Sequence, residues 1–350
     1  MKKLISRLRT FIRRLMGKNA RTLWISHSIF AKHEPGLYHP ESPARIVAIE
    51  AELKNQNIWP KLQTAQAQEI SDKQLALVHP RKYLRFLENH QPQKGKIYRI
   101  DDDTIMSHGS LQAIRFAAGA VVQAVNMVMN KKACHAFCAV RPPGHHAHSD
   151  KAGGFCLINN VAVGVMHAIA EYRLQRVAVI DFDIHFGDGT AEIFKDDPRV
   201  MFLNLFGKDL FPFVLPESRQ GRNPHMIHTP FPTGTCSRAF RSVIREAWLP
   251  KLAEFKPELV LISAGFDAHK REETSRLNLH EADFAWLTDK IVQTASSCNG
   301  KIVSVLEGGY TLEPLAKSAA AHIHVLAGLP KADYVSQYEQ QLKGGKRFSK

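Results

Sequence analysis

The sequence predicts an α/β fold in which an open parallel sheet carries helices on both faces, and three observations support this prediction. Short apolar runs rich in β-branched and aromatic residues recur without polar alternation, as in strands that are buried on both faces. Longer stretches of helical character separate these runs. Polar residues and glycines follow the runs directly, at the edge of the sheet where α/β proteins bind their ligands.

The predicted elements alternate along the chain. The predicted strands cover residues 136–140, 177–180, 200–205, 259–262 and 302–306. The predicted helices cover residues 110–129, 160–172 and 237–255. Strands that alternate with helices in this way form a parallel sheet. Because no linker, repeat or low-complexity segment interrupts the chain from Leu23 onward, we expect residues 21–330 to form one domain.

Composition excludes several classes of protein. The chain has 350 residues, of which 44% are hydrophobic and 23% charged, unlike a disordered, collagenous or coiled-coil protein. No uninterrupted apolar run approaches the roughly 20 residues of a membrane span. Five cysteines without a CxxC pair argue against a disulfide scaffold and favour a reducing, cytoplasmic location. Four of them are expected to be small buried residues: Cys134, Cys138, Cys236 and Cys298.

The formal charge of +14 is concentrated at the N-terminus, where the first twenty-two residues hold eight Lys and Arg and no acid. Residues 2–16 place their apolar side chains on one arc of a helix, so we interpret residues 1–20 as a basic amphipathic extension. Such a helix contacts anionic membrane surfaces or directs a protein to an organelle, and a solvated extension is the alternative. Residues 331–350 resemble a frayed, polar basic tail. A specific nucleic-acid partner is not expected.

The polar residues after the predicted strands suggest a metal site. Asp183 and His185 are two residues apart in extended chain, so their side chains point to the same side. Asp267 follows another strand and supplies a third ligand. Two carboxylates and one imidazole leave a position open for water, as in catalytic sites. Zn²⁺ and Fe²⁺ both suit this ligand set.

Acid–base groups accompany these ligands. His145 and His146 follow the strand at residues 136–140, and adjacent histidines in a turn diverge, so that they rarely bind one metal ion together. They suit acid–base catalysis beside a metal-bound water if a carboxylate orients each ring, and Asp181 and Asp188 are available for this. Tyr310 follows two glycines after the last predicted strand, where its hydroxyl can donate to a developing oxyanion.

Five motifs occur in an order that resembles the histone deacetylase family. They are RPPGHHA (141–147), GGFCLINN (153–160), DFDIHFGDGT (181–190), SAGFDAH (263–269) and LEGGY (306–310). The resemblance extends over residues 21–330 and is greatest to the class II-like branch, which includes bacterial deacetylase-like amidohydrolases and acetylpolyamine amidohydrolases. It implies the arginase/deacetylase fold, with an open parallel sheet of about eight strands, and zinc-dependent hydrolysis of an acetylated amine.

The resemblance also implies roles for individual residues. By position, Asp183, His185 and Asp267 match the metal ligands, and His145, His146 and Tyr310 match the catalytic residues. The acids behind the histidines match Asp181 and Asp188. Family members bind potassium near the residues that correspond to Asp181 and Asp183. The residues that match the substrate-binding positions are Asp103, Gly154, Phe155 and Phe211.

Three departures from the family pattern bear on activity and substrate choice. Phe186 replaces a histidine that is not a metal ligand, so we expect activity to survive. Asn204 replaces a serine near the potassium site. Residues 272–275 replace a common loop at the pocket rim, and counting puts Thr274 at the rim position. The substrate therefore remains either acetyl-lysine in a protein or a small acetylated amine such as an acetylpolyamine, and a catalytically silent acyl-amine binding module is a further alternative.

Overall fold

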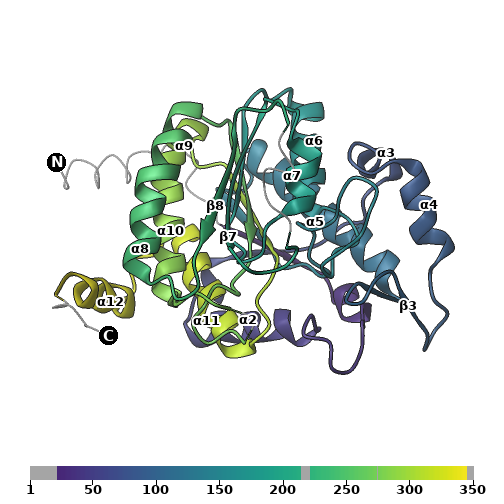
Figure 1. Cartoon of the computed structure of the whole chain (residues 1–350), viewed down its shortest axis with the longest axis horizontal. Helices are drawn as coiled ribbons and strands as arrows, with labels where there is room; N and C mark the ends of the chain where they lie inside the picture. Colours follow the sequence, from purple (N-terminus) through teal and green to yellow (C-terminus); the bar gives the residue numbers. More distant parts are fainter. Residues whose placement is uncertain (1–21, 214–220, 274, 345–350) are drawn as a thin grey trace.

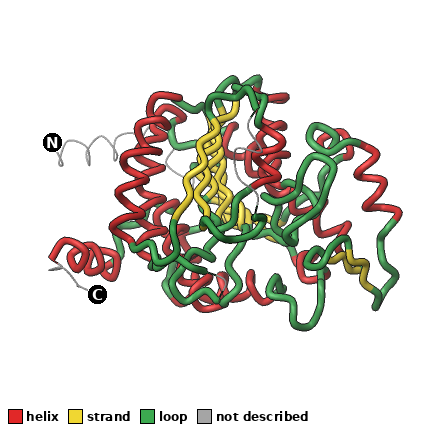
Figure 2. Tube along the Cα trace, in the orientation of Figure 1, coloured by secondary structure: helices red, strands yellow, loops and turns green. Residues whose placement is uncertain are grey.

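A parallel sheet of eight strands runs through the centre of the molecule (Figures 1 and 2). The computed structural model describes residues 22–213, 221–273 and 275–344. The order of strands across the sheet is β2-β1-β5-β10-β9-β6-β7-β8, and each neighbouring pair is parallel. The strands are β1 (Leu23–Ser26), β2 (Gln63–Gln66), β5 (His135–Cys138), β6 (Val177–Asp181), β7 (Val200–Gly207), β8 (Met226–Phe231), β9 (Leu259–Ala264) and β10 (Ile302–Leu306).

Helices cover both faces of this sheet (Figure 1). One face carries α5 (Ser110–Met129), α6 (Asn160–Tyr172) and α7 (Asp188–Phe194). The other face carries α2 (Ala44–Asn55), α8 (Ser237–Val243), a π-helical turn (Ile244–Trp248), α9 (Leu249–Phe255), α10 (Glu281–Thr294) and α11 (Leu312–Leu326). Beyond the first face lie α3 (Asp72–Leu75), α4 (Arg81–Asn89) and the small antiparallel pair of β3 (Ile97–Arg99) and β4 (Ile105–Ser107). A last helix, α12 (Asp333–Gly344), packs beside α10.

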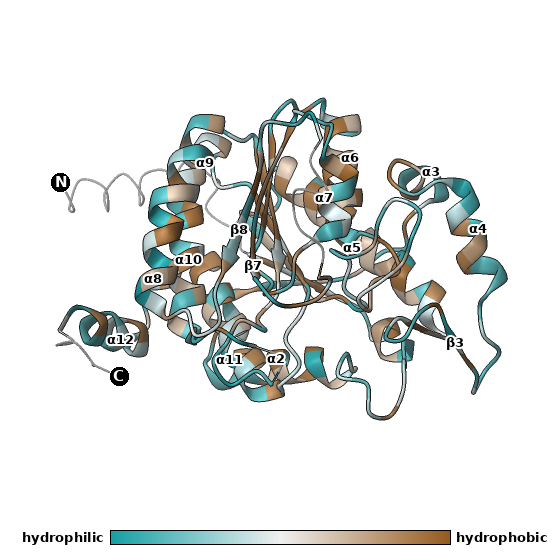
Figure 3. Ribbon diagram, viewed as in Figure 1, coloured by the Kyte–Doolittle hydropathy of each residue, from teal (hydrophilic) through white to brown (hydrophobic). Residues whose placement is uncertain are grey.

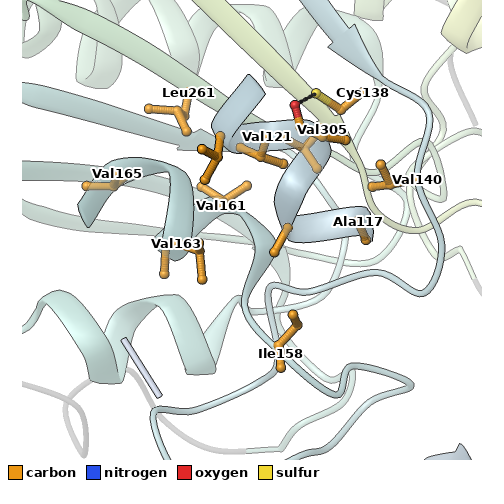
Figure 4. Close-up of a cluster of buried hydrophobic side chains, with 14 of the residues drawn as sticks. Ala117, Val121, Cys138, Val140, Ile158, Val161, Val163, Val165, Leu261 and Val305 are labelled. Carbon is orange, nitrogen blue, oxygen red and sulfur yellow. Dashed lines mark hydrogen bonds between the residues drawn. The ribbon is translucent and has the colours of Figure 1, made fainter. Parts of the chain in front are cut away.

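Two hydrophobic cores explain why the strand residues are apolar without alternation. In β6, Val177 and Val179 belong to the core under α5 and α6, whereas Ala178 and Ile180 belong to the core under α10 and α11. Alternate side chains of a strand point to opposite faces, so a sheet covered on both sides needs apolar residues at every position. Figure 3 shows the strands as predominantly hydrophobic, and Figure 4 shows Val121 of α5 and Val161 of α6 packed against Leu261 of β9.

Most of the predicted fold is confirmed. All five predicted strands form within a few residues of their predicted bounds, and the helices predicted over 110–129 and 160–172 have the observed bounds. The helix predicted over 237–255 forms as α8, the π-helical turn and α9. The bounds of three strands of the eight-stranded sheet, and of the separate β3–β4 pair, were not predicted. β1 and β2 have only four residues each, and β8 is a half-exposed edge strand.

Some expectations outside the sheet are wrong. The tail predicted to be frayed forms α12 over residues 333–344, with Val335 buried against α10 and α11. Cys236 is exposed and Cys134 only half-buried. The helix α5 has the length and apolar composition of a membrane span although polar residues interrupt it, and most of it is buried as a core helix of this domain. The predicted amphipathic extension, residues 345–350 and Thr274 lie outside the described residues.

Candidate active site

Four neighbouring strands end at the candidate site. β5, β10, β9 and β6 are adjacent in the sheet although they are far apart in the sequence. Because they are parallel, their carboxyl ends meet at one edge. The chain after β5 brings His145 and His146 to this edge, and β10 leads to Tyr310. β9 leads to Asp267, and β6 leads to the 181–190 motif.

The three predicted metal ligands come together at this edge. Ligand atoms of Asp183, His185 and Asp267 lie within 4.8 Å of one another. The Nδ1 atom of His185 is 3.0 Å from Asp183 Oδ1 and 3.1 Å from Asp267 Oδ2. Both carboxylates are fully buried, whereas the imidazole is partly exposed. The cluster is therefore closed on the side of the sheet and reachable from the side of the imidazole.

Backbone groups fix the two carboxylates. Asp183 Oδ2 accepts the N–H of Gly308 at 2.8 Å, and Asp267 Oδ1 accepts the N–H of Ile184 at 2.9 Å. A Cβ atom at Gly308 would overlap both carboxylates, and one at Gly265 would overlap Asp183. Only glycine lets the ends of β9 and β10 approach the acids so closely. The local sequence therefore holds the acids in place before any ligand binds.

The charges in the cluster favour a cation. Burial and the negative charge of Asp183 raise the pKa of Asp267 to about 6. Burial lowers the pKa of His185, but hydrogen bonds to Asp183 and Asp267 outweigh it and raise that pKa to about 10. Two buried carboxylates whose oxygens lie within 4.8 Å of each other remain ionised only beside positive charge. A bound divalent ion would supply that charge.

Each tandem histidine bonds to the carboxylate predicted for it. His145 Nδ1 lies 3.0 Å from Asp181 Oδ2, and His146 Nδ1 lies 2.8 Å from Asp188 Oδ1. The two rings are 4.0 Å apart between centroids. Because each Nδ1 faces a carboxylate, the hydrogen bond places the proton on Nδ1 and leaves Nε2 for the site.

The tandem histidines differ in protonation. Burial lowers the pKa of His145, but the charges of Asp183 and Asp181 outweigh it and raise the pKa well above its usual range. Burial and the charge of His145 lower the pKa of His146 to about 4. The two pKa values are therefore shifted in opposite directions, which favours the charged form of His145 and the neutral form of His146.

The tyrosine predicted to stabilise an oxyanion is held from several directions. Burial raises the pKa of Tyr310 well above 10, so its hydroxyl keeps its proton. The guanidinium of Arg45 lies over the ring at 5.0 Å and donates Nε–H to the carbonyl of Gly309 at 2.6 Å. The backbone N–H of Tyr310 donates to Glu272 Oε2 at 2.9 Å. These contacts fix both the ring and the main chain of the tyrosine.

Three of the residues that match the family's substrate-binding positions lie beside these groups. The ring of Phe211 meets His146 edge-on at 4.9 Å, and the ring of Phe155 meets Tyr310 edge-on at 5.5 Å. Gly154 has φ +51°, and a Cβ atom there would overlap His146 and contact Phe211 at 2.8 Å. Gly154, Phe155 and Phe211 therefore lie next to the histidines and the tyrosine.

Asp103, the fourth of these predicted substrate-binding residues, lies near Phe155. Asp103 is half-buried and accepts the hydroxyl of Thr104 at 2.9 Å. That same hydroxyl accepts the backbone N–H of Phe155 at 3.2 Å, which links the acid to Phe155. Burial raises the pKa of Asp103.

The structure adds residues to which the sequence analysis assigned no role. Glu307, within the LEGGY motif, accepts the N–H groups of Gly144 and His145 at 2.6 and 3.2 Å. His148 Nε2 lies 2.8 Å from the second oxygen of Asp188, so two histidines share this carboxylate. The spacing of the histidines in HHAH was a signal for this, because residues two apart can reach one group.

A buried ionic network behind the site was also missed. Glu41 pairs with Arg45 at 3.1 Å and with Arg141 at 2.5 Å, and all three side chains are fully buried. Burial raises the pKa of Glu41, but the two arginines and His33 outweigh it and lower that pKa far below its usual range. Glu41 precedes α2 and only Arg45 lies within it, so neither the helix pattern nor any other local signal indicated this network.

The fold and the side chains together define a class of protein. The class is an α/β protein that holds, among the described residues, two carboxylates and an imidazole able to bind a metal ion, beside two His–Asp pairs at the carboxyl ends of its central strands. A family model described as "Histone deacetylase domain" matches residues 39–326. The chain therefore belongs to the histone deacetylase family, as its motifs predicted, and it is a deacetylase.

Individual relatives agree with this assignment. A protein of Archaeoglobus fulgidus named "Probable deacetylase" is 35% identical over 83% of this chain and 81% of its own length. The mouse protein named "Polyamine deacetylase HDAC10" is 33% identical over 83% of this chain but only 45% of its own length. The solved structure of the HDA15 HD domain superposes with a TM-score of 0.83 at 28% identity, covering 93% of this chain and 96% of that one.

Proposed function

We propose that this deacetylase is zinc-dependent and hydrolyses the N-acetyl amide of a lysine side chain in a polypeptide. The observation that carries the proposal is the convergence of Asp183, His185 and Asp267 within 4.8 Å, beside two His–Asp pairs. Nitrogen and carboxylate donors in this number suit Zn²⁺ and also Fe²⁺. When bound, the ion supplies Lewis-acid polarisation of the acetyl carbonyl and lowers the pKa of water.

The chain's own residues then move the protons. The neutral His146 accepts a proton at Nε2 from the attacking water, while Asp188 holds its Nδ1–H and stabilises the charged ring. The Tyr310 hydroxyl donates a hydrogen bond to the carbonyl oxygen as negative charge develops there. The histidine pair returns the proton to the leaving nitrogen. A C–O bond forms and the C–N bond breaks, giving acetate and a free amine.

A potassium ion near Asp181 and Asp183 is part of the proposal. Among the described residues, Asn204 Oδ1 is a buried oxygen with no hydrogen-bond partner, and Asn204 lies opposite Asp181 in the sheet. A buried carbonyl oxygen without a donor is costly unless a cation or water satisfies it. Asparagine at this position therefore suits a potassium ion, because an amide oxygen is a ligand for hard cations.

The environment of Glu272 supports a lysine substrate over a polyamine. Its carboxylate is buried and accepts hydrogen bonds from the N–H groups of Tyr310 and Thr311. Glu272 is therefore not available to attract a cationic polyamine. The favoured substrate is the acetylated side chain of a polypeptide, because the Phe155 and Phe211 walls admit an apolar stem.

A substrate panel tests this proposal. Zinc-loaded protein is assayed for acetate release from an acetyl-lysine peptide and from an acetylated spermidine of matched concentration. We expect the peptide to give the higher kcat/KM. The opposite order would identify an acetylpolyamine amidohydrolase, and binding of both without hydrolysis would identify an acyl-amine binding module.

A further inference from the structure

We propose a second binding site, for a small molecule that carries two or more phosphate groups, between α8, α10 and α12. A hollow of about 470 Å³ lies there, and its wall contains six Lys and Arg side chains but only two acids. Figure 1 shows α12 beside α8 and α10, and none of the residues of the hollow belongs to the active site described above.

Three arginines form a row along one wall of the hollow. Arg238, Arg241 and Arg245 are spaced three and four residues apart on the helix that runs from α8 into the π-helical turn, so they lie on one face. Like charges at this spacing repel one another and destabilise a helix. A bound anion would relieve that repulsion.

Two of these arginines are held in place by aromatic stacking. The guanidinium groups of Arg241 and Arg245 lie 5.1 and 5.0 Å from the ring centroid of Trp286, which is buried on α10. Arg241 is also bound to Asp283 at 2.7 Å, so its charge is already neutralised. Arg245 is different, because no carboxylate of the described residues pairs with it.

The other cations enclose Arg245. Lys290 lies one turn beyond Trp286 on α10, and Lys331 and Lys343 come from the two ends of the α12 segment. Lys331 pairs with Glu339, and Lys290 lies 3.7 Å from Asp289. The remaining excess of positive charge is therefore centred on Arg245 and the C-terminal end of α12.

This arrangement favours phosphate over other anions. A guanidinium stacked on an indole has a fixed plane, and its fork of N–H donors matches two phosphate oxygens. Several cations around one hollow match several phosphates, whereas a single carboxylate would leave most of them unpaired. The hollow is concave and small, so it suits a small ligand or a lipid headgroup better than a nucleic-acid duplex.

One wall of the site lies beyond the residues that the family model matches. The family match ends at residue 326, and α12, which supplies one wall, begins at Asp333. The wall is attached to the domain by few apolar contacts, with Val335 as its buried side chain. Arg238 donates Nε–H to the carbonyl of Leu342 at 3.0 Å and so links α8 to α12. A ligand between the two helices would strengthen this attachment.

Titration of the full-length chain with sodium tripolyphosphate tests the proposal. Calorimetry measures its Kd at fixed ionic strength, with sodium sulfate as the reference anion, and Trp emission reports on Trp286. We expect Arg245→Ala to raise the Kd at least about tenfold, which corresponds to about 1.4 kcal/mol. Arg245→Lys keeps the positive charge but loses the forked N–H donors, so its Kd for tripolyphosphate should lie between those of the wild type and Arg245→Ala. Trp286→Phe should abolish the emission change.

A matched control separates this site from general charge attraction. Arg222 is an exposed arginine that lines no part of this hollow, so Arg222→Ala removes the same charge and should leave the Kd unchanged. The basic N-terminal residues are present in every variant, so their contribution to the Kd cancels when the variants are compared. Equal effects of Arg222→Ala and Arg245→Ala, or tripolyphosphate binding no tighter than sulfate, would overturn the proposal.

Vesicles distinguish the two sources of such a ligand. Phosphatidylcholine vesicles with and without phosphatidylinositol bisphosphate are sedimented with the wild-type chain and with Arg245→Ala. Binding that depends on the bisphosphate lipid and on Arg245 supports a headgroup ligand, and tripolyphosphate binding alone supports a free phosphorylated molecule. Duplex DNA is tested as a competitor of tripolyphosphate. If it displaces tripolyphosphate, and if Arg222→Ala and Arg245→Ala weaken DNA binding equally, the proposed small-molecule site would be overturned.

Discussion

The floor and the rim of the active site are built differently. On the floor, Asp183 and Asp267 are completely buried, and backbone N–H groups fix their oxygens. At the rim, Asp103 is half-buried and Phe213 is 79% exposed. A fully hydrogen-bonded buried group tolerates almost no change, whereas an exposed loop residue has room to change. The floor therefore sets the reaction and the rim sets the substrate.

The largest effect is expected on the floor, at a metal ligand. Asp267→Asn removes one of two negative charges from the cation site, so we expect loss of bound metal and of nearly all deacetylation together. Metal content is measured by mass spectrometry and activity by acetate release. Asp333→Asn, on exposed α12, is the matched control and should retain both. Full turnover with full metal content in Asp267→Asn would show that the floor is assigned wrongly.

The next effect is expected where the floor meets the substrate. Tyr310→Phe removes the hydroxyl but keeps the ring contacts with Phe155 and Arg45. We expect kcat to fall about 10²–10³-fold, the usual loss for one oxyanion donor, with KM and metal content nearly unchanged. Steady-state kinetics measure this split. A loss confined to KM would instead place the tyrosine in substrate binding at the rim.

The sequence predicts some residues of the site and not others. The ligands and tandem histidines were predictable because each directly follows a buried strand, and parallel strands gather their ends at one edge. Arg45 and Glu272 were not, because they act on the backbone of residues 309 and 310 from 264 and 38 residues away. Such pairings depend on tertiary packing and leave no local pattern.

The fold shows the same limit. The long buried strands and helices have strong apolar patterns and were predictable. The edge strand β2 alternates half-buried and exposed residues over only four positions, and it forms because β1 lies beside it. The helix α12 is polar and was read as a tail, yet the Tyr338 ring stacks on His280 at 4.3 Å and bonds Ser237 at 2.7 Å. Whether such elements form depends on the parts of the chain that they pack against rather than on their own composition.

A smaller effect is expected just behind the floor. His148→Leu removes one of the two hydrogen bonds that hold Asp188, and so loosens the partner of His146. We expect kcat to fall about tenfold, in the range for residues that orient a catalytic group, with KM unchanged. His148→Gln keeps an N–H donor at the position of Nε2 and should restore most of the activity. Equal activity of the Leu and Gln variants would show that the bond has no positioning role.

The smallest effect is expected at the rim, and it tests the comparison most directly. The Phe213 ring meets Phe211 at 6.4 Å between centroids and is otherwise exposed. Phe213→Ala should raise KM for an acetyl-lysine peptide about threefold, because partial burial of an aromatic ring against the peptide contributes less than full burial would. A short acetylated amine does not reach this ring, so its KM should not change. If kcat fell instead of KM rising, the rim would share in the chemistry and the division between floor and rim would be wrong.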